Sequence, residues 1–148
     1  MTKRYPFAGL ELEICDDWFD VTDDLPAGSP PTLAPAEGVG ALQFSVVWYE
    51  SGKEPNVTPG ALTDLLREFG EQRRLGVLSN EVSVEGPGTS LVSGDFQSAG
   101  EFIRVWYVSN GRDIALVTYC CTTPGAQIAD ELKDTDAMVR SLSFAPSQ

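Results

Sequence analysis

Apolar residues recur at every second position in two stretches of the first fifty residues. Residues 10–14 alternate aliphatic side chains with glutamates, and residues 39–49 repeat the pattern with Leu42, Phe44, Val46 and Trp48. A period of two is typical of a β-strand with one face toward a core and the other toward solvent. We therefore expect strands over residues 7–15 and 39–49, and a third, shorter strand over residues 18–22.

Two threonine–proline pairs predict the starts of two helices. Thr58 suits an N-cap and Pro59 the first helical position, where the N–H that proline lacks would have no partner within the helix. The apolar residues that follow fall on one stripe, at spacings of three and four: Leu62, Leu65, Leu66 and Phe69. Gly76 is the expected C-terminal cap. Thr123-Pro124 predicts a second helix that buries Ile128, Leu132 and Val139, with Ala129 and Thr135 between them.

Between the two helices the chain has only strand and turn patterns. Four strands are expected there, over residues 77–85, 90–97, 101–109 and 113–121. Asn110-Gly111 predicts a tight hairpin turn between the last two, because both residues tolerate positive φ. The prolines and glycines of residues 23–38 predict a loop with extended segments and no helix. Leu142-Ser143-Phe144 either adds a short edge strand or packs back onto the sheet.

The resulting order is three strands, a helix, four strands and a helix. Two helices separated by an antiparallel meander predict an α+β fold, with helices packed on an antiparallel sheet of about six to seven strands. The chain has 148 residues, of which 42% are hydrophobic. A domain of this length buries roughly two-thirds of its unfolded surface, so we expect residues 1–148 to form a single domain.

The chain is strongly acidic, with a formal net charge of −12. Nucleic acids and anionic membranes both require clustered Lys and Arg residues, and Arg73-Arg74 is the nearest approach to such a cluster, so neither partner is expected. A basic protein would be attracted, although acidity that only keeps a bacterial cytosolic domain soluble is the simpler alternative. No apolar run reaches the roughly 20 residues that span a bilayer, and Glu11 and Glu13 interrupt any signal-peptide pattern. We expect a cytoplasmic protein.

Histidine is absent, and the three cysteines are Cys15, Cys120 and Cys121. Without imidazole, Ser-His-Asp and Cys-His catalysis and every histidine-containing zinc site are excluded. Three cysteines without C-x-x-C spacing support neither a disulfide framework nor a four-cysteine metal site. Neighbouring strand residues point to opposite faces, so one vicinal thiol is expected in the core. The alternative for the vicinal cysteines is redox sensing or pairing with Cys15. For the chain as a whole, no enzyme activity, cofactor or metal is expected.

The densest group of acidic residues comprises Asp16, Asp17, Asp20, Asp23 and Asp24. Closely spaced carboxylates can bind Ca²⁺, which takes about six to eight oxygen ligands, but the spacing here is not that of an EF-hand loop. A solvated turn is the simpler interpretation. The first three of these aspartates are candidates for an interface with a partner.

Two Trp-Tyr pairs, Trp48-Tyr49 and Trp106-Tyr107, lie on predicted strands or at their ends. Each pair places one ring on each face of its strand, so the Trp of one pair and the Tyr of the other are candidates for partial exposure. Exposed aromatic residues mark protein interfaces, whereas helices on both sheet faces would make the rings part of the core. The candidate interface residues are therefore Trp48, Tyr49, Trp106, Tyr107, Asp16, Asp17 and Asp20.

Two segments of the chain resemble the PsbP/DcrB-like superfamily. The first is the opening strand over residues 7–14, which leads to Asp17-Trp18 where the family more often has Gly-Trp. The second comprises residues 113–119, the Thr123-Pro124 helix start and the ending over residues 141–144. As an order of elements, the resemblance covers nearly the whole chain. It implies an α/β sandwich of three layers with an antiparallel sheet.

The superfamily includes photosystem extrinsic subunits, a yeast Ran-binding regulator of nuclear import and bacterial effector chaperones. It has no common active site, so the resemblance carries no functional residue to this chain. It implies a class of small domains that dock onto other proteins.

Three functions are expected from these observations. The leading one is a non-enzymatic protein-binding module, such as an adaptor, an effector chaperone or an immunity protein against a basic toxin. The second is a small-ligand or metal-binding domain, with a pocket formed by carboxylates and by Trp48, Trp106 or Tyr107. The third is a subunit that dimerises through an edge strand, such as the one ending at Phe144, so the chain is expected to be a monomer or a homodimer.

Overall fold

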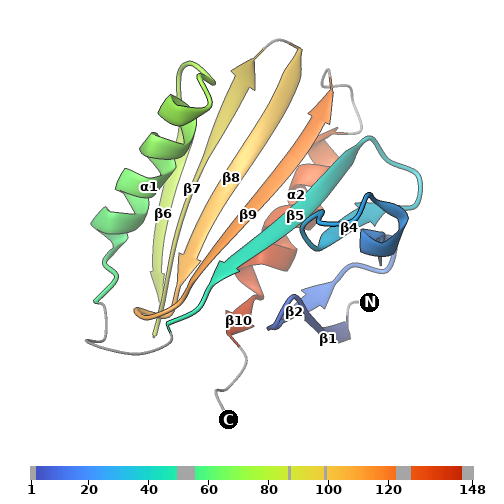
Figure 1. The fold of residues 1–148 in the computed structure, drawn as a ribbon, viewed down its shortest axis with the longest axis horizontal. Coiled ribbons are helices and arrows are strands. Elements are labelled where there is room, and N and C mark those ends of the chain that lie inside the picture. The colour runs from blue at the N-terminus through green and yellow to red at the C-terminus, as the bar shows by residue number, and fades with distance from the viewer. Residues whose placement is uncertain (1–2, 50–55, 87, 99, 123–127, 145–148) are drawn as a thin grey trace.

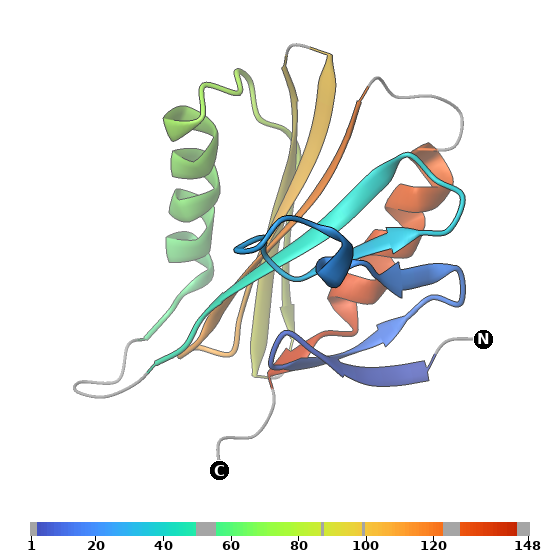
Figure 2. The same ribbon diagram turned by 45° about the vertical axis from the view of Figure 1, so that its right-hand side comes forward.

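A computed structural model describes residues 3–49, 56–86, 88–98, 100–122 and 128–144. A seven-stranded antiparallel sheet forms the middle layer (Figure 1). The two helices, α1 (Pro59–Gln72) and α2 (Ile128–Arg140), pack on opposite faces of this sheet (Figure 2). The structure confirms the α+β fold and the three layers.

The large sheet has the strand order β3-β4-β5-β9-β8-β7-β6. Its strands are β3 (Trp18–Asp20), β4 (Thr32–Pro35), β5 (Gly40–Val47), β6 (Ser79–Gly86), β7 (Thr89–Ser98), β8 (Glu101–Ser109) and β9 (Ile114–Thr122). A second, three-stranded antiparallel sheet has the order β1-β2-β10. Its strands are β1 (Lys3–Phe7), β2 (Leu10–Ile14) and β10 (Ser143–Phe144). The chain end thus forms the short edge strand that was one of its two expected placements.

The first third of the chain is richer in strands than its pattern predicts. Five strands precede α1 rather than three, because β1 and β4 form around Pro6 and Pro35. Proline is tolerated at such edge positions and strand ends, where its missing N–H removes no essential ladder bond. A short 3₁₀ helix, Thr22–Asp24, also begins just before the segment expected to hold no helix.

Two hydrophobic clusters hold the layers together. The cluster on the α2 face contains the fully buried Leu10, Leu12, Phe44, Trp106 and Tyr119, with Met138 and Val139 of α2. The cluster on the α1 face contains Leu62, Leu66 and Phe69 of α1, with Val92, Val105 and Tyr107 of the sheet. Alternate residues of β8 and β9 enter the two clusters, because successive strand side chains point to opposite faces.

The Asn110-Gly111 turn differs from the expected two-residue hairpin. Strand pairing ends at Ser109↔Ile114, so four residues form the loop, and only Gly111 of the pair has a positive φ (+93°). The Asn110 side chain explains the difference. Its Oδ1 accepts hydrogen bonds from the N–H groups of Arg112 (3.0 Å) and Asp113 (2.7 Å), and such a side-chain turn replaces the backbone turn.

The structure confirms the predicted start of α1 and corrects its end. The Thr58 side chain accepts a hydrogen bond from the N–H of Ala61 (3.2 Å), as an N-cap does. At the other end, the N–H of Leu75 donates to the carbonyl of Gly70 and that of Arg74 to the carbonyl of Glu71. This is a Schellman motif, and its left-handed position is occupied by Arg74 (φ +53°) rather than by a glycine.

In α2 the buried face agrees with the expected one at Thr135 and Val139 and differs from it in the first turns. Its buried residues are Glu131, Thr135, Met138 and Val139. Ile128 and Leu132 are only half-buried and Ala129 is exposed. The expected helix start, Thr123-Pro124, lies outside the described residues.

The left-handed conformation of Arg74 generates a stability prediction. For a residue with a Cβ this conformation costs about 1–2 kcal/mol, and glycine relieves that strain at the price of more freedom in the unfolded chain. We expect Arg74→Gly to raise the free energy of unfolding by about 0.5–1 kcal/mol, measured by chemical denaturation.

Gly76 provides the matched control, because its φ is +85° and no atom would lie within 4 Å of an added Cβ. Gly76→Ala therefore adds backbone strain without a steric clash and should lower stability by about 1 kcal/mol. Equal effects of the two substitutions would contradict the role assigned to Arg74.

Candidate functional site

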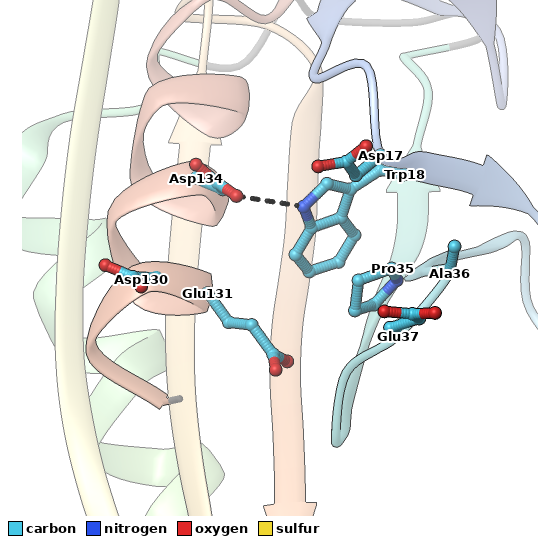
Figure 3. Close-up of a pocket in the computed structure, with 8 residues that line it drawn as sticks. All are labelled: Asp17, Trp18, Pro35, Ala36, Glu37, Asp130, Glu131 and Asp134. Atoms are coloured by element: carbon cyan, nitrogen blue, oxygen red, sulfur yellow. Dashed lines mark hydrogen bonds between the residues drawn. The ribbon is translucent and has the colours of Figure 1, made fainter. Parts of the chain in front are cut away.

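An acidic pocket lies between α2 and the β3–β4 hairpin (Figure 3). Its volume is about 530 Å³, and it is lined by Asp17, Trp18, Pro35, Ala36, Glu37, Asp130, Glu131 and Asp134. Five of these eight side chains are carboxylates and none is basic. We call this hollow the acidic pocket.

Glu131 is the most deeply buried carboxylate of the pocket, with 6% of its surface exposed. Its Oε1 accepts hydrogen bonds from the Tyr119 hydroxyl (2.8 Å) and the Gly40 N–H (3.0 Å), and its Oε2 accepts one from the Val39 N–H (3.0 Å). These three donors compensate for the loss of water around the carboxylate. They also join α2 to the start of β5 and to β9.

Gly40 permits the close approach of this network. A Cβ on Gly40 would collide with the ring and hydroxyl of Tyr119, so no larger residue fits while that tyrosine remains. Burial, and then the hydrogen bond to Glu131, raise the pKa of Tyr119 far above its ordinary value. The hydroxyl therefore keeps its proton and remains a donor to the carboxylate.

Trp18 forms the wall of the pocket opposite α2 (Figure 3). Its Nε1–H donates to Oδ2 of Asp134 (3.2 Å), and strand pairing sets it directly across from Pro35. The carbonyl of Asp17 accepts a hydrogen bond from the Ala36 N–H (2.8 Å), which continues the hairpin. The hairpin side of the pocket thus combines Trp18 and Pro35 with the carboxylates of Asp17 and Glu37, and α2 supplies the other three carboxylates (Figure 3).

A second hollow adjoins the acidic pocket and shares Trp18 with it. It has a volume of about 370 Å³ and is lined by Tyr5, Pro6, Phe7, Ile14, Cys15, Asp16, Trp18, Phe19 and Asp20. Tyr5 and Phe19 are 45% and 53% exposed, which is unusual for large rings in a chain with a well-filled core. We call this hollow the aromatic hollow. Together the two hollows present exposed rings beside many carboxylates.

Cys15 lines the aromatic hollow but has the properties of an unreactive thiol. Its Sγ lies 3.9 Å from the carbonyl of Asp134. Burial, followed by the nearby carboxylates of Asp134 and Asp16, raises the pKa of the Cys15 thiol. A raised pKa disfavours the nucleophilic thiolate at neutral pH.

The expected interface residues fall into three places. Asp16, Asp17 and Asp20 line the two hollows. Trp106 and Tyr107 lie in the α2-face and α1-face clusters, with exposures of only 0% and 8%, so neither lines the acidic pocket.

The other expected pair, Trp48 and Tyr49, follows β5 and lines neither hollow. Trp48 is half-exposed and packs edge-to-face on Phe144. The N–H of Tyr49 donates to Asp113 (2.7 Å).

The vicinal cysteines point to opposite faces of the sheet, as expected from their strand. Cys121 is buried in the α2-face cluster and Cys120 packs at the edge of the α1-face cluster. All three cysteines are free thiols, and burial raises the pKa of both vicinal ones.

The carboxylates of the described residues were compared with the requirements of a metal site. Within the described residues, no group of three or more aspartate, glutamate, cysteine or histidine side chains is placed to hold a metal ion. Asp23 and Asp24 lie in the exposed 3₁₀ helix. Among the same residues, no helix has the length and apolarity needed to cross a membrane.

The contribution of α2 to the site was not predicted from the sequence. Asp130, Glu131 and Asp134 occupy spacings of three and four on that helix, which places them near one another on its surface. This spacing is visible in the sequence. The three residues line a pocket only because the β3–β4 hairpin, which lies almost 100 residues earlier in the chain, packs opposite them.

Comparisons with known proteins support the fold. No protein-family model and no curated protein sequence matches the chain. Among solved structures, the chain is similar to the cyanobacterial PsbP protein (CyanoP) of Synechocystis. The TM-score is 0.61 at 15% identity, over 97% of this chain and 92% of that one. The chain therefore has a PsbP-like fold.

A protein of Bacteroides thetaiotaomicron, solved by crystallography, is also similar, with a TM-score of 0.57 at 11% identity. The match covers 99% of this chain but 48% of that protein, so the chain spans about half its length. At these identities the likeness establishes the fold, as the sequence resemblance implied, and no function.

The donors around Glu131 generate a stability prediction. In Glu131→Gln one carboxylate oxygen becomes an NH₂ group, which must then face an N–H or O–H donor. We expect a loss of about 2 kcal/mol, since one hydrogen bond disappears and a buried donor is left without an acceptor. Asp130→Asn removes the same charge from the next, exposed residue and should change the free energy of unfolding by under about 0.5 kcal/mol. Equal losses would contradict the network.

The raised pKa of Tyr119 generates a prediction for alkaline pH. In the unfolded chain a tyrosine ionises near pH 10, whereas the folded Tyr119 stays protonated. Its contribution is therefore complete below about pH 10 and declines above it, by up to about 1.4 kcal/mol per pH unit. Tyr119→Phe should make the decline of the unfolding free energy between about pH 9 and 11 shallower, as measured by chemical denaturation at each pH.

Proposed function

We propose that the protein is a non-enzymatic binding module that holds a basic, partly apolar segment of another protein. In this proposal the acidic pocket receives Lys or Arg side chains, and the aromatic hollow receives a neighbouring apolar side chain. The main support for this proposal is that Trp18 lines both hollows: the acidic pocket with its five carboxylates and the aromatic hollow with its two exposed rings.

Electrostatics favours a basic partner at this site. The lining of the acidic pocket contains no cation to balance its carboxylates. The net charge of −12 extends the same field over the whole molecule. Such a field steers a basic partner toward the surface and accelerates its association, and the effect weakens as salt is added.

The exposed rings favour a protein as the partner. Aromatic residues that remain exposed beside a polar rim are typical of protein interfaces, where they become buried on binding. Tyr5 and Phe19 lie on β1 and β3, so both rings are carried by strands rather than by loops. Rings held in place lose little conformational freedom when a partner binds.

A small polycation is the second candidate ligand. The volume of about 530 Å³ lies within the usual range for small-molecule pockets. A polyamine would use the acidic pocket alone and leave Tyr5 and Phe19 unburied. The same experiment therefore distinguishes the two candidates.

A role in the cytoplasm, as an adaptor, an effector chaperone or an immunity protein, belongs to the same proposal. Three free thiols are compatible with a reducing compartment, where disulfides are rare. The absence of histidine from the chain removes the commonest general base, which supports a role in binding over catalysis.

Binding can be tested with a short peptide of alternating Arg and Leu residues, a peptide with Glu in place of Arg, and spermine. We expect the Arg-Leu peptide to bind and to shift the NMR signals of the Trp18 indole and of the Tyr5 and Phe19 rings. Added salt should lower its affinity. Binding of spermine alone would favour the small-ligand candidate. Equal binding of both peptides would contradict the electrostatic proposal.

The double variant Glu37→Gln/Asp130→Asn tests whether the acidic pocket is the site. Removing two pocket charges should weaken the Arg-Leu peptide about tenfold, since each exposed charge contributes up to about 1 kcal/mol. Asp23→Asn/Asp24→Asn removes two charges from the exposed 3₁₀ helix and is the matched control. Equal weakening by the two variants would mean that only net charge matters.

A further inference from the structure

At the opposite end of the large sheet, β6 is exposed along its whole length. All eight of its residues are exposed, including Val82 and Val84. Among the described strands it pairs with β7 alone and is the last strand of the sheet. The main contacts of α1 are with β7 and β8, and those of α2 are with β5, β9 and β2, so neither helix lies mainly over β6.

We propose that this free edge binds an extended segment of another protein, as an eighth strand whose residues alternate between basic and apolar. The backbone of β6 would supply the ladder hydrogen bonds, as in other cases of strand addition. This site is separate from the acidic pocket, and the inference does not depend on the function proposed for that pocket.

The apolar half of the pattern follows from a groove on the α2 side of β6. Two hollows of about 180 and 380 Å³ lie there and meet at Arg140. Val84 lines the smaller hollow together with Leu91, Val108, Val139 and Leu142, and Val82 lines the larger one. The smaller hollow is mainly apolar, whereas the larger one is lined mostly by polar and charged side chains: Asn80, Ser93, Arg104, Lys133, Asp136 and Arg140. An apolar side chain of an added strand would therefore extend the surface beside Val84.

The arginines in the groove, Arg104 and Arg140, are already paired with carboxylates and do not favour an acidic partner. Arg104 makes two hydrogen bonds to the buried Asp95, at 2.6 and 2.8 Å, and Arg140 pairs with Asp136 at 2.7 Å. Lys133 lines the larger hollow and does not line the one beside Val84. The smaller hollow therefore presents a mainly apolar surface.

The basic half of the pattern follows from the opposite face of β6. Glu81 and Glu85 lie on the α1 side, where Glu81 is 3.6 Å from Arg67 of α1. Both glutamates are exposed and lie on one strand face, where Glu81 is already paired with Arg67 and Glu85 forms no ion pair with a described residue. Opposite charges across neighbouring strands stabilise their pairing, so Lys or Arg residues at alternate positions of the guest fit this face.

A second copy of the chain fits this edge poorly. In the symmetric antiparallel register centred on Ser83, Glu81 of one copy would lie opposite Glu85 of the other, twice. Like charges directly opposite destabilise a strand pair. Two copies that each carry a net charge of −12 also repel one another.

The β6 edge already has the extended conformation that pairing with another strand requires. A register shift between Ser79 and Val82 lies within the first half of β6, where Asn80 adopts a positive φ (+53°). The Asn80 side chain donates to Asp95 (2.9 Å), the same carboxylate that binds Arg104. From Val82 to Gly86 the strand then follows β7 in regular register. A strand already in place lowers the entropy lost when a partner binds.

The test uses an acetylated, amidated peptide of alternating Lys and Val residues, and a matched peptide with Glu in place of Lys. Both are added to the intact Glu37→Gln/Asp130→Asn protein, whose acidic pocket is weakened. We expect the Lys-Val peptide to shift the amide signals of residues 79–86 and to slow their hydrogen exchange, with the Trp18 indole signal unchanged. The Glu-Val peptide should do neither.

Charge reversal on β6 tests the basic half of the pattern. Glu81→Lys/Glu85→Lys should weaken the Lys-Val peptide about tenfold, because two cross-strand pairs change from attractive to repulsive. Asp23→Lys/Asp24→Lys makes the same change in net charge at a distant place and should leave the affinity within about twofold once salt is added. Amide spectra of both variants verify that they fold.

Three results would overturn the proposal. The first is a peptide response at Trp18 with none in residues 79–86, which would assign binding to the acidic pocket. The second is unchanged affinity in Glu81→Lys/Glu85→Lys. The third is protection of the β6 amides without peptide in a protein that sediments as a dimer, which would make a second copy the occupant.

Discussion

The carboxylate of Glu131 fixes the arrangement on which the candidate site depends. It joins α2 to the first residues of β5 and to Tyr119 of β9 through three hydrogen bonds. A buried carboxylate with no cation beside it is tolerated only when donors replace its water. Because β4 pairs with β5 and β3 with β4, fixing the start of β5 also positions Trp18 opposite α2. These three hydrogen bonds thus connect the two sides of the acidic pocket.

The two ends of the large sheet expose different kinds of chemistry. At the β3 end, side chains dominate: carboxylates in a concave pocket and rings in the adjoining hollow. At the β6 end, unpaired backbone dominates, with valines on one face and glutamates on the other. In the two proposals both ends receive basic partners, in keeping with the net charge of −12. They would recognise different features, since a pocket selects side chains whereas a strand edge selects an extended backbone.

Much of the fold followed from local patterns, because helix α1 and strands β2 and β5 have a regular apolar period and strands β7, β8 and β9 are bounded by turn residues. The features that were missed depend on contacts elsewhere. β4 contains Pro35 and is stabilised as a strand by pairing with β5. The left-handed Arg74 is held by a Schellman motif that usually contains glycine. In the Asn110 turn, side-chain hydrogen bonds replaced the expected backbone geometry.

The candidate site was less predictable than the fold for the same reason. Asp16, Asp17 and Asp20 were recognised because they are close in sequence, and the structure places all three at the two hollows. Glu131 was missed because an apolar period assigns buried positions to apolar residues, and its backbone donors lie 91 and 92 residues away. The aromatic pairs were visible in the sequence, but which rings are covered depends on how the helices pack.

The close contact between Gly40 and Tyr119 has a consequence for how this sequence can diverge. A Cβ at position 40 would collide with the tyrosine ring, and the tyrosine hydroxyl is one of three donors to Glu131. An alanine at position 40 therefore requires a smaller residue at position 119, which in turn removes a donor and disfavours a carboxylate at position 131. These three positions, far apart along the chain, are expected to covary in related sequences and to drift only together.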